Sequence, residues 1–151
     1  MSPVDDPNLL NEKTFEEIIE TYGSNVGWEF DEIDSTHAVV SFEMESDRTL
    51  VLYITNHDDL VEFDIPTDAK FMEESEIPGD FSIQLLKRNS LLNYGLWTVE
   101  EIEGDFYYSL MYNEELKILR TRTAEEFAAI VDILLHECDE VESLWLDRKG
   151  R

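Results

Sequence analysis

Basic side chains are scarce in this chain. It has 11 Lys and Arg against 36 Asp and Glu, so its formal net charge is −25 over 151 residues. Proteins that bind nucleic acid through its phosphates need clustered Lys and Arg to release counterions, and anionic lipid surfaces also attract basic segments. The sequence therefore predicts that neither nucleic acid nor a membrane is a partner.

Cysteine and long apolar runs are scarce as well. Cys138 is the single cysteine, which excludes an intrachain disulfide and fits a reducing compartment. No apolar run approaches the roughly 20 residues that span a bilayer. Residues 1–7 lack the basic and apolar regions of a signal peptide. We expect a soluble cytoplasmic protein.

Motifs that carry chemistry are also missing. The 6 glycines are scattered and form no phosphate-binding loop. The histidines, His37, His57 and His136, have no zinc-ligand spacing, and the acidic run over residues 58–64 lacks the pattern of a calcium-binding loop. We expect no cofactor, no metal and no catalytic residues. An acid–base pair hidden among the 36 carboxylates is the alternative that the sequence leaves open.

Enough apolar residues are present to build one core. Hydrophobic residues make up 42% of the chain and aromatic residues 11%, and a chain of this length fits one domain. We expect a flexible leader over residues 1–11, a single domain over residues 12–147 and a polar tail over residues 148–151. The acidic residues are spread along the chain, which indicates a solvated surface or a face that recruits a basic partner.

The first half of the chain shows first a helical period and then the period of strands. We expect a helix over residues 13–22 that ends at Gly23. Thr14 has the spacing of a capping box at its start, and Asn11 is the competing cap. Residues 66–79 read as a loop, with a short turn of helix over residues 69–72. Alternating apolar residues predict an antiparallel meander with one wet face, formed by strands over residues 26–31, 39–44, 49–55 and 60–65.

The second half returns to a helix, then a hairpin, then a helix. We expect a helix over residues 80–93 and a hairpin of residues 96–101 and 106–112. A long final helix begins with a second capping box at Thr123 and buries Leu134 and Cys138. The expected order is α-β-β-β(-β)-α-β-β-α. The sequence therefore predicts the α+β class, with helices packed on one antiparallel sheet.

From the second expected helix onward the chain resembles the YbjN family, which is itself similar in fold to type III secretion chaperones. Residues 85–97 carry the likeness, because a Leu-rich helix end with an Asn is followed by Gly95 and by Trp97 entering a strand. The likeness in layout extends over residues 12–146. It implies a type III secretion chaperone-like domain that dimerises, binds other proteins and has no known catalytic machinery. Proteins of the family are linked to stress-related regulation.

The resemblance also implies two contact surfaces. Type III chaperones hold a partner segment in extended form over apolar surface, partly by adding it to a sheet edge. The residues that we expect to bind the partner are Ile18, Tyr22, Trp28 and Phe30. A two-fold contact through the second helix and the following strand would use Leu92, Tyr94, Leu96 and Trp97. We expect Asn89 to have a structural role, in capping or packing the turn.

The expected function is therefore a non-enzymatic protein-binding module, chaperone-like or regulatory, that acts as a small acidic dimer. One alternative is an interaction protein of a salt-adapted cell, whose acidity serves solubility alone. The other is a small carboxylate-dependent enzyme. A pocket of converging carboxylates with shifted pKa values would favour the enzyme, and an exposed apolar patch would favour the binding module.

Overall fold

The computed structural model describes residues 13–150, so the expected leader over residues 1–11 lies outside the described residues. It confirms the α+β class and the predicted order, and it adds the two-residue strand β1 and the short helix α4. The elements are α2 (Phe15–Val26), β1 (Glu32–Ile33), β2 (His37–Glu43), β3 (Thr49–His57), β4 (Leu60–Phe71), the 3-10 helix η2 (Glu74–Glu76), α3 (Gly79–Asn89), β5 (Leu96–Ile102), β6 (Asp105–Glu115), α4 (Leu116–Leu119) and α5 (Ala124–Lys149).

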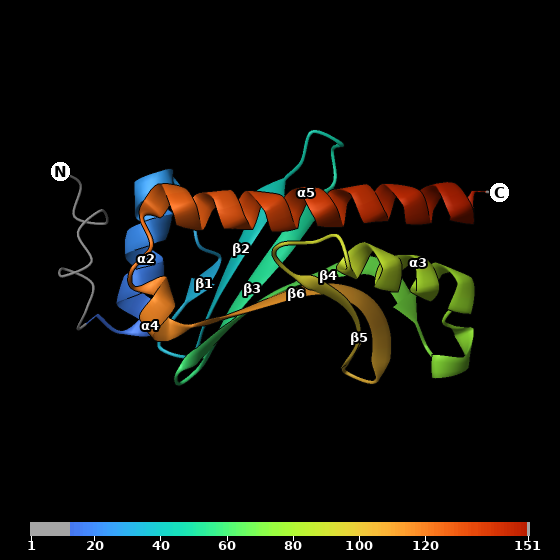
Figure 1. Ribbon diagram of the computed structural model, residues 1–151, viewed down its shortest axis with the longest axis horizontal. Coiled ribbons are helices and arrows are strands. Elements are labelled where there is room, and N and C mark those ends of the chain that lie inside the picture. Colours follow the sequence, from blue (N-terminus) through green and yellow to red (C-terminus); the bar gives the residue numbers. More distant parts are fainter. Residues whose placement is uncertain (1–12, 151) are drawn as a thin grey trace.

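The strands form one six-stranded antiparallel sheet in the order β1-β2-β3-β4-β6-β5. Burial alternates along them: on β3, Leu50, Leu52 and Ile54 are buried, whereas the side chains between them are more accessible. The buried face packs against α2 and against α5, which runs along the molecule in Figure 1. The predicted antiparallel meander is confirmed for the strands expected over residues 39–44, 49–55 and 60–65. One face of the sheet is wet, as predicted, and we call it the open face.

Both predicted capping boxes are present. The Thr14 side chain accepts from the Glu17 N–H and the Thr123 side chain accepts from the Glu126 N–H, and each Glu bonds back to the cap residue. These caps satisfy backbone donors at the starts of α2 and α5. Leu134 and Cys138 are buried on α5, as predicted. The helix itself continues to Lys149, so it includes the first two residues of the polar tail that we expected over residues 148–151.

The strand expected over residues 26–31 is absent from the described chain, because α2 continues through Gly23 to Val26. Gly27, with φ of 84°, ends the helix in the left-handed conformation instead. Gly23 serves a close approach: a Cβ there would lie 2.4 Å from Cζ of Phe30. The alternation of Trp28 and Phe30 therefore reflects packing against α2 and the core and not a strand.

The loop expected over residues 66–79 is wrong over its first part, because β4 continues through Pro66 to Phe71. The pairing of β3 with β4 ends at Asp64. Pro66, which has no backbone N–H to donate, therefore lies where one side of β4 has no partner strand. The register with β6 shifts between Pro66 and Lys70. Thr67 supports this irregularity, since its Oγ1 donates to the Tyr108 carbonyl at 2.8 Å and accepts from the Ala69 N–H at 3.2 Å.

Two helix boundaries also differ from expectation. The turn of helix expected over residues 69–72 lies further on, as η2. Helix α3 ends at Asn89 and not at residue 93, since the chain turns there before entering β5. Beyond the register shift, β5 and β6 curve away from the rest of the sheet beside α3 (Figure 1). This curvature sets the geometry of the candidate site.

Candidate functional site

The expected partner-binding residues do not form an accessible surface. Ile18 and Tyr22 are 0% exposed, so this prediction is wrong for both. The Tyr22 ring stacks on Phe127 at 4.8 Å, and its hydroxyl donates to the Leu119 carbonyl at 2.7 Å. Trp28 and Phe30 are half-buried and pack against the core. These four side chains fix α2 to the sheet and to α5.

The expected dimer residues are separated by the fold. Trp97 is 3% exposed, so its place in a two-fold contact is wrong, whereas Leu96 is 50% exposed on the opposite face of β5. Neighbouring residues of a strand face opposite sides of the sheet. Leu92 and Tyr94 are half-buried against the core, with the Tyr94 ring 5.6 Å from that of Tyr112. Of the four residues, Leu96 alone offers a largely exposed apolar side chain.

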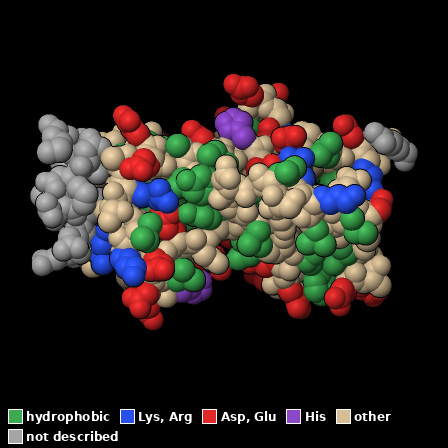
Figure 2. All heavy atoms as spheres, in the orientation of Figure 1, with side chains coloured by type: hydrophobic (Ala, Val, Ile, Leu, Met, Phe, Trp, Pro, Cys, Tyr) green, Lys and Arg blue, Asp and Glu red, His purple; other side chains and the backbone are tan. Residues whose placement is uncertain are grey.

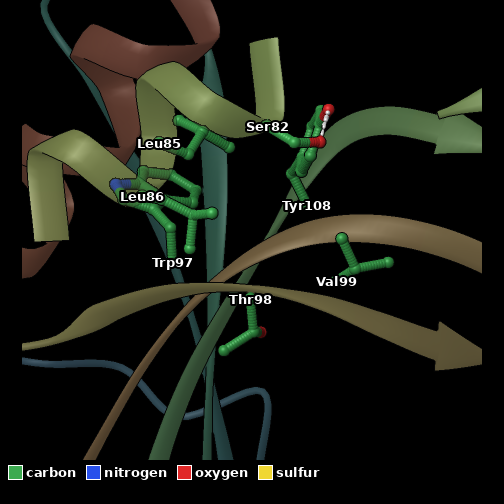
Figure 3. A pocket seen from close by; sticks show the side chains of 7 residues that line it. All are labelled: Ser82, Leu85, Leu86, Trp97, Thr98, Val99 and Tyr108. Carbon is green, nitrogen blue, oxygen red and sulfur yellow. Dashed lines mark hydrogen bonds between the residues drawn. The ribbon is translucent and has the colours of Figure 1, made fainter. Parts of the chain in front are cut away.

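A groove lies between α3 and the edge of the sheet (Figure 3). We call it the β5 groove, and it is lined by Ser82, Leu85, Leu86, Trp97, Thr98, Val99 and Tyr108. Its volume is about 170 Å³, which is below the range of about 300–1,000 Å³ that is usual for small-molecule sites. The groove therefore suits one or two apolar side chains and not a cofactor.

Apolar side chains surround the β5 groove and remain open to solvent. Leu86 and Val99, which line the groove, are 63% and 46% exposed. Ile83, elsewhere on α3, is 54% exposed. Figure 2 shows hydrophobic side chains gathered over α3 and β5, near the C-terminal end of α5. Contiguous exposed apolar surface on a soluble domain marks a contact site more often than single exposed residues do. This feature favours a protein-binding surface.

The floor of the β5 groove has little polar character to offer a ligand. Ser82 Oγ and the Tyr108 hydroxyl lie 2.7 Å apart, and the same hydroxyl donates to the Pro78 carbonyl at 3.1 Å. Burial raises the pKa of Tyr108, so its hydroxyl stays protonated. Since these polar groups bond to one another, an entering side chain meets mainly carbon.

Beside the groove runs the outer edge of β5, the last strand of the sheet. Asn89 occupies this edge at Trp97: Asn89 Oδ1 accepts from the Trp97 N–H at 2.6 Å, and Nδ2 donates to the Trp97 carbonyl at 3.2 Å. Alternate residues of a strand direct their backbone groups to the same side. Val99 and Glu101 therefore direct theirs outward, and no strand of residues 13–150 pairs with this side of β5.

A partly buried charged cluster holds α3 and β5 in place. Arg88 on α3 forms two hydrogen bonds to the Glu137 carboxylate of α5, at 2.8 and 2.7 Å. Trp97 Nε1 donates to the same carboxylate at 2.8 Å. The hydrogen bond to Glu137 raises the pKa of Arg88 further, so the guanidinium stays charged. The β5 groove is thus built on side chains whose positions are fixed.

Other candidate chemistry is structural. Cys138 is fully buried, and burial raises the pKa of its thiol, so it is a core residue and not a nucleophile. Within residues 13–150, no group of three or more His, Cys, Asp or Glu side chains is arranged to hold a metal ion. None of the helices in the described part of the chain is both long enough and apolar enough to cross a bilayer.

Sequence reasoning had a signal for one part of the site and none for another. The signal is that Leu85 is followed directly by Leu86 in the second helix, which offers more apolar surface than one packing face needs. The carboxyl groups of Asp64 and Glu100, which come together on the open face, gave no signal. They lie on strands that are not neighbours, and acidic residues are frequent throughout the chain.

No protein-family model matches this chain, and no curated protein matches it.

Proposed function

We propose that this protein is a non-enzymatic protein-binding module, chaperone-like or regulatory, which binds an extended segment of another protein along the outer edge of β5. The observation that carries the proposal is the position of an exposed apolar groove directly beside an unpaired strand edge. An added strand gains main-chain hydrogen bonds from the edge, and pockets for alternate side chains give specificity. We further propose membership of the YbjN family and a cytoplasmic location, supported by the element order and by the composition.

The geometry defines what the segment must look like. Its backbone pairs with Val99 and Glu101, because Asn89 already occupies the edge at Trp97. The residue next to Val99 points to the helix-covered side and places an apolar side chain in the β5 groove. The segment is therefore short, extended and apolar at alternate positions.

A second copy of the chain is a separate partner in this proposal. Leu91 is 83% exposed in the turn before β5, and Leu96 is 50% exposed at its start. We propose that these two side chains, and not Trp97, form the apolar centre of a homodimer. The charge of −25 on each copy opposes this association, so salt should strengthen it.

Selection from a displayed library of random linear dodecapeptides, followed by titration of the enriched peptides, tests the segment-binding proposal. Leu86→Asp places a charge at the groove, and Glu101→Pro removes an outward N–H without removing a bond to β6. The matched controls are Ile133→Asp, at an apolar site 44% exposed on α5, and Glu101→Ala. We expect affinity to fall about tenfold or more with each test variant, as for the loss of a central apolar anchor or of main-chain pairing.

The controls should bind the enriched peptides as the wild type does. Absence of any enriched peptide, or equal affinity of all four variants, would contradict the proposal. Circular dichroism of each variant separates a lost site from a lost fold.

A further inference from the structure

Three buried oxygen atoms on the open face receive no hydrogen bond from any N–H group or hydroxyl within residues 13–150. They are Asp64 Oδ1, Glu100 Oε2 and Ser109 Oγ. Asp64 is 6% exposed and Ser109 is 0% exposed, whereas Glu100 is half-buried. Buried polar atoms are almost always paired in native structures. A proton between the carboxyl groups of Asp64 and Glu100 pairs these two with each other, whereas Ser109 Oγ has no partner among the described residues.

The strand register places these residues on one diagonal. Asp64 on β4 lies opposite Met111 of β6, and Ser109 lies two positions before Met111 on the same strand. Glu100 on β5 lies opposite Tyr107, a further two positions along β6 in the same direction. Glu100 is therefore the member of this set on the edge strand, close to the outward groups of Val99 and Glu101.

The two carboxyl groups interact with each other. Burial raises the pKa of Asp64 far above its ordinary value, and the hydrogen bond to Glu100 and the charges of Glu100 and Glu62 add to the effect. Two carboxylates can form such a contact only when one of them carries a proton. Burial makes Asp64 the member of the pair that holds this proton.

Building on the proposed strand addition, we propose that the bound segment carries a lysine or arginine beside Glu100 and that this cation replaces the proton shared by Asp64 and Glu100. In an added strand, the residue directly opposite Glu100 has its Cβ within about 5.5 Å on the same face. The cation bonds to the Glu100 carboxylate, the proton leaves to solvent, and the pair gains one negative charge. Asp64 acts through Glu100 as a positioning residue.

The proposal specifies the chemistry of the partner. Because neighbouring residues of a strand face opposite sides, the segment has an apolar residue for the β5 groove immediately next to a basic residue for Glu100. The charge of the chain agrees with a basic partner. Other titratable side chains directed to this face near the pair are Tyr53 on β3, Glu62 and Lys70 on β4, and Tyr107 on β6. Lys70 Nζ forms an ion pair with Asp105 Oδ2 at 3.2 Å. Lys70 therefore has its own partner, and the carboxyl groups of Asp64 and Glu100 remain available to a basic residue of the bound segment.

Two measurements test the exchange. Carboxyl carbon NMR of the free protein follows the titration of Asp64 and Glu100 directly and needs no ligand. Calorimetry of the enriched peptides at pH 7, in phosphate and in Tris, counts the protons released from the dependence of heat on buffer ionisation. We expect about one proton released per peptide bound, and about a tenfold loss of affinity when the basic residue of the peptide is replaced by glutamine.

Asp64→Asn should bind the peptides without releasing a proton, because the amide donates permanently to Glu100. Glu45→Gln, an exposed change near the β2–β3 turn, should behave as the wild type. The contrary outcome is that the enriched peptides lose affinity for Leu86→Asp and yet bind without a preference for a basic residue and without releasing a proton. That result would overturn this inference and leave the proposed function intact. A free protein with both carboxyls ionised at pH 7 would also overturn it, and failure to enrich any peptide would remove both proposals.

Discussion

The side-chain amide of Asn89 makes both hydrogen bonds to the backbone of Trp97 that a neighbouring strand would make. Asn89 thereby occupies the outer edge of β5 at Trp97, near the start of the strand. The outward N–H and C=O groups of the residues that follow have no partner strand among the described residues. A single side chain thus sets where an added strand can begin.

Replacing Asn89 tests this role. Asn89→Ala leaves the Trp97 N–H and carbonyl without their partner, and we expect the free energy of unfolding to fall by about 1–2 kcal/mol. Chemical denaturation measures the change. Asn93→Ala, at an exposed position in the same turn, should stay within about 0.5 kcal/mol of the wild type. Equal effects at the two positions would show that the Asn89 bonds contribute nothing.

Arg88 should contribute more to the free energy of unfolding than a surface arginine does. Arg88→Met leaves the Glu137 carboxylate buried with the Trp97 donor as its remaining bond, and we expect a loss of about 2–3 kcal/mol. Arg148→Met makes the same change of charge at a more exposed pair with Asp80 and should cost less than about 1 kcal/mol. Adding Glu137→Gln to Arg88→Met should restore part of the loss, and the absence of any recovery would contradict a cost due to the buried charge.

Glu142 should make the protein less stable as the pH rises. Burial raises its pKa to about 7, while the Asp68 N–H, which donates to Oε1 at 3.0 Å, favours the charged form. The unfolded chain ionises this group near its ordinary pKa of 4.5. The folded state therefore holds the proton more tightly, and the penalty grows between these two values and stays constant above them.

The corresponding variant removes that titration. Glu142→Gln should melt higher than the wild type at pH 8, and the difference should shrink towards pH 5. Thermal melts across this range measure it, with Glu45→Gln as the exposed control. A difference that does not vary with pH would contradict the assigned cause.

Leu134 on α5 tests the phase of the longest helix. It is 1% exposed, whereas its neighbour Ile133 is 44% exposed. Leu134→Ala should cost roughly 2–5 kcal/mol in unfolding free energy, and Ile133→Ala should cost well under half of that. Similar losses at the two positions would be inconsistent with this packing.

Self-association should depend on salt and on Leu96. Between about 0.1 M and 1 M NaCl the Debye length falls from about 10 Å to about 3 Å, which weakens repulsion between two copies of charge −25. We expect light scattering to show the mean mass rising from monomer towards dimer over this range. Leu96→Asp should abolish the rise, with Ile133→Asp as the control, and a monomer at molar salt would remove the dimer.

Local signals predicted most of the fold, and long-range contacts account for what they missed. The capping boxes at Thr14 and Thr123 and the alternation on β3 depend on neighbouring residues and are confirmed. Trp28 and Phe30 alternate as in a strand, yet their partner is the surface of a helix beside Gly23. Pro66 is tolerated within β4 because the pairing of β4 with β3 ends at Asp64. The local sequence gives no sign of where that pairing ends.

The candidate site was less predictable for the same reason. Leu85 and Leu86 indicated an apolar helix side, but the groove needs α3 to lie beside the edge of β5. That arrangement depends on the bonds from Arg88 and Trp97 to Glu137, which lies at least 40 positions further along the chain. Burial of Ile18 and Tyr22 depends likewise on α5.

Helix α5 joins the two ends of the molecule through its aromatic residues. Phe127, near its start, stacks on Tyr22 of α2, and Trp145, near its end, lies 5.2 Å from the ring of Phe81 on α3. A continuous helix that contacts both ends couples their unfolding into one cooperative transition. Amide hydrogens of α2 that exchange only through global opening should therefore slow when a peptide occupies the β5 groove, although no atom of the peptide comes near them.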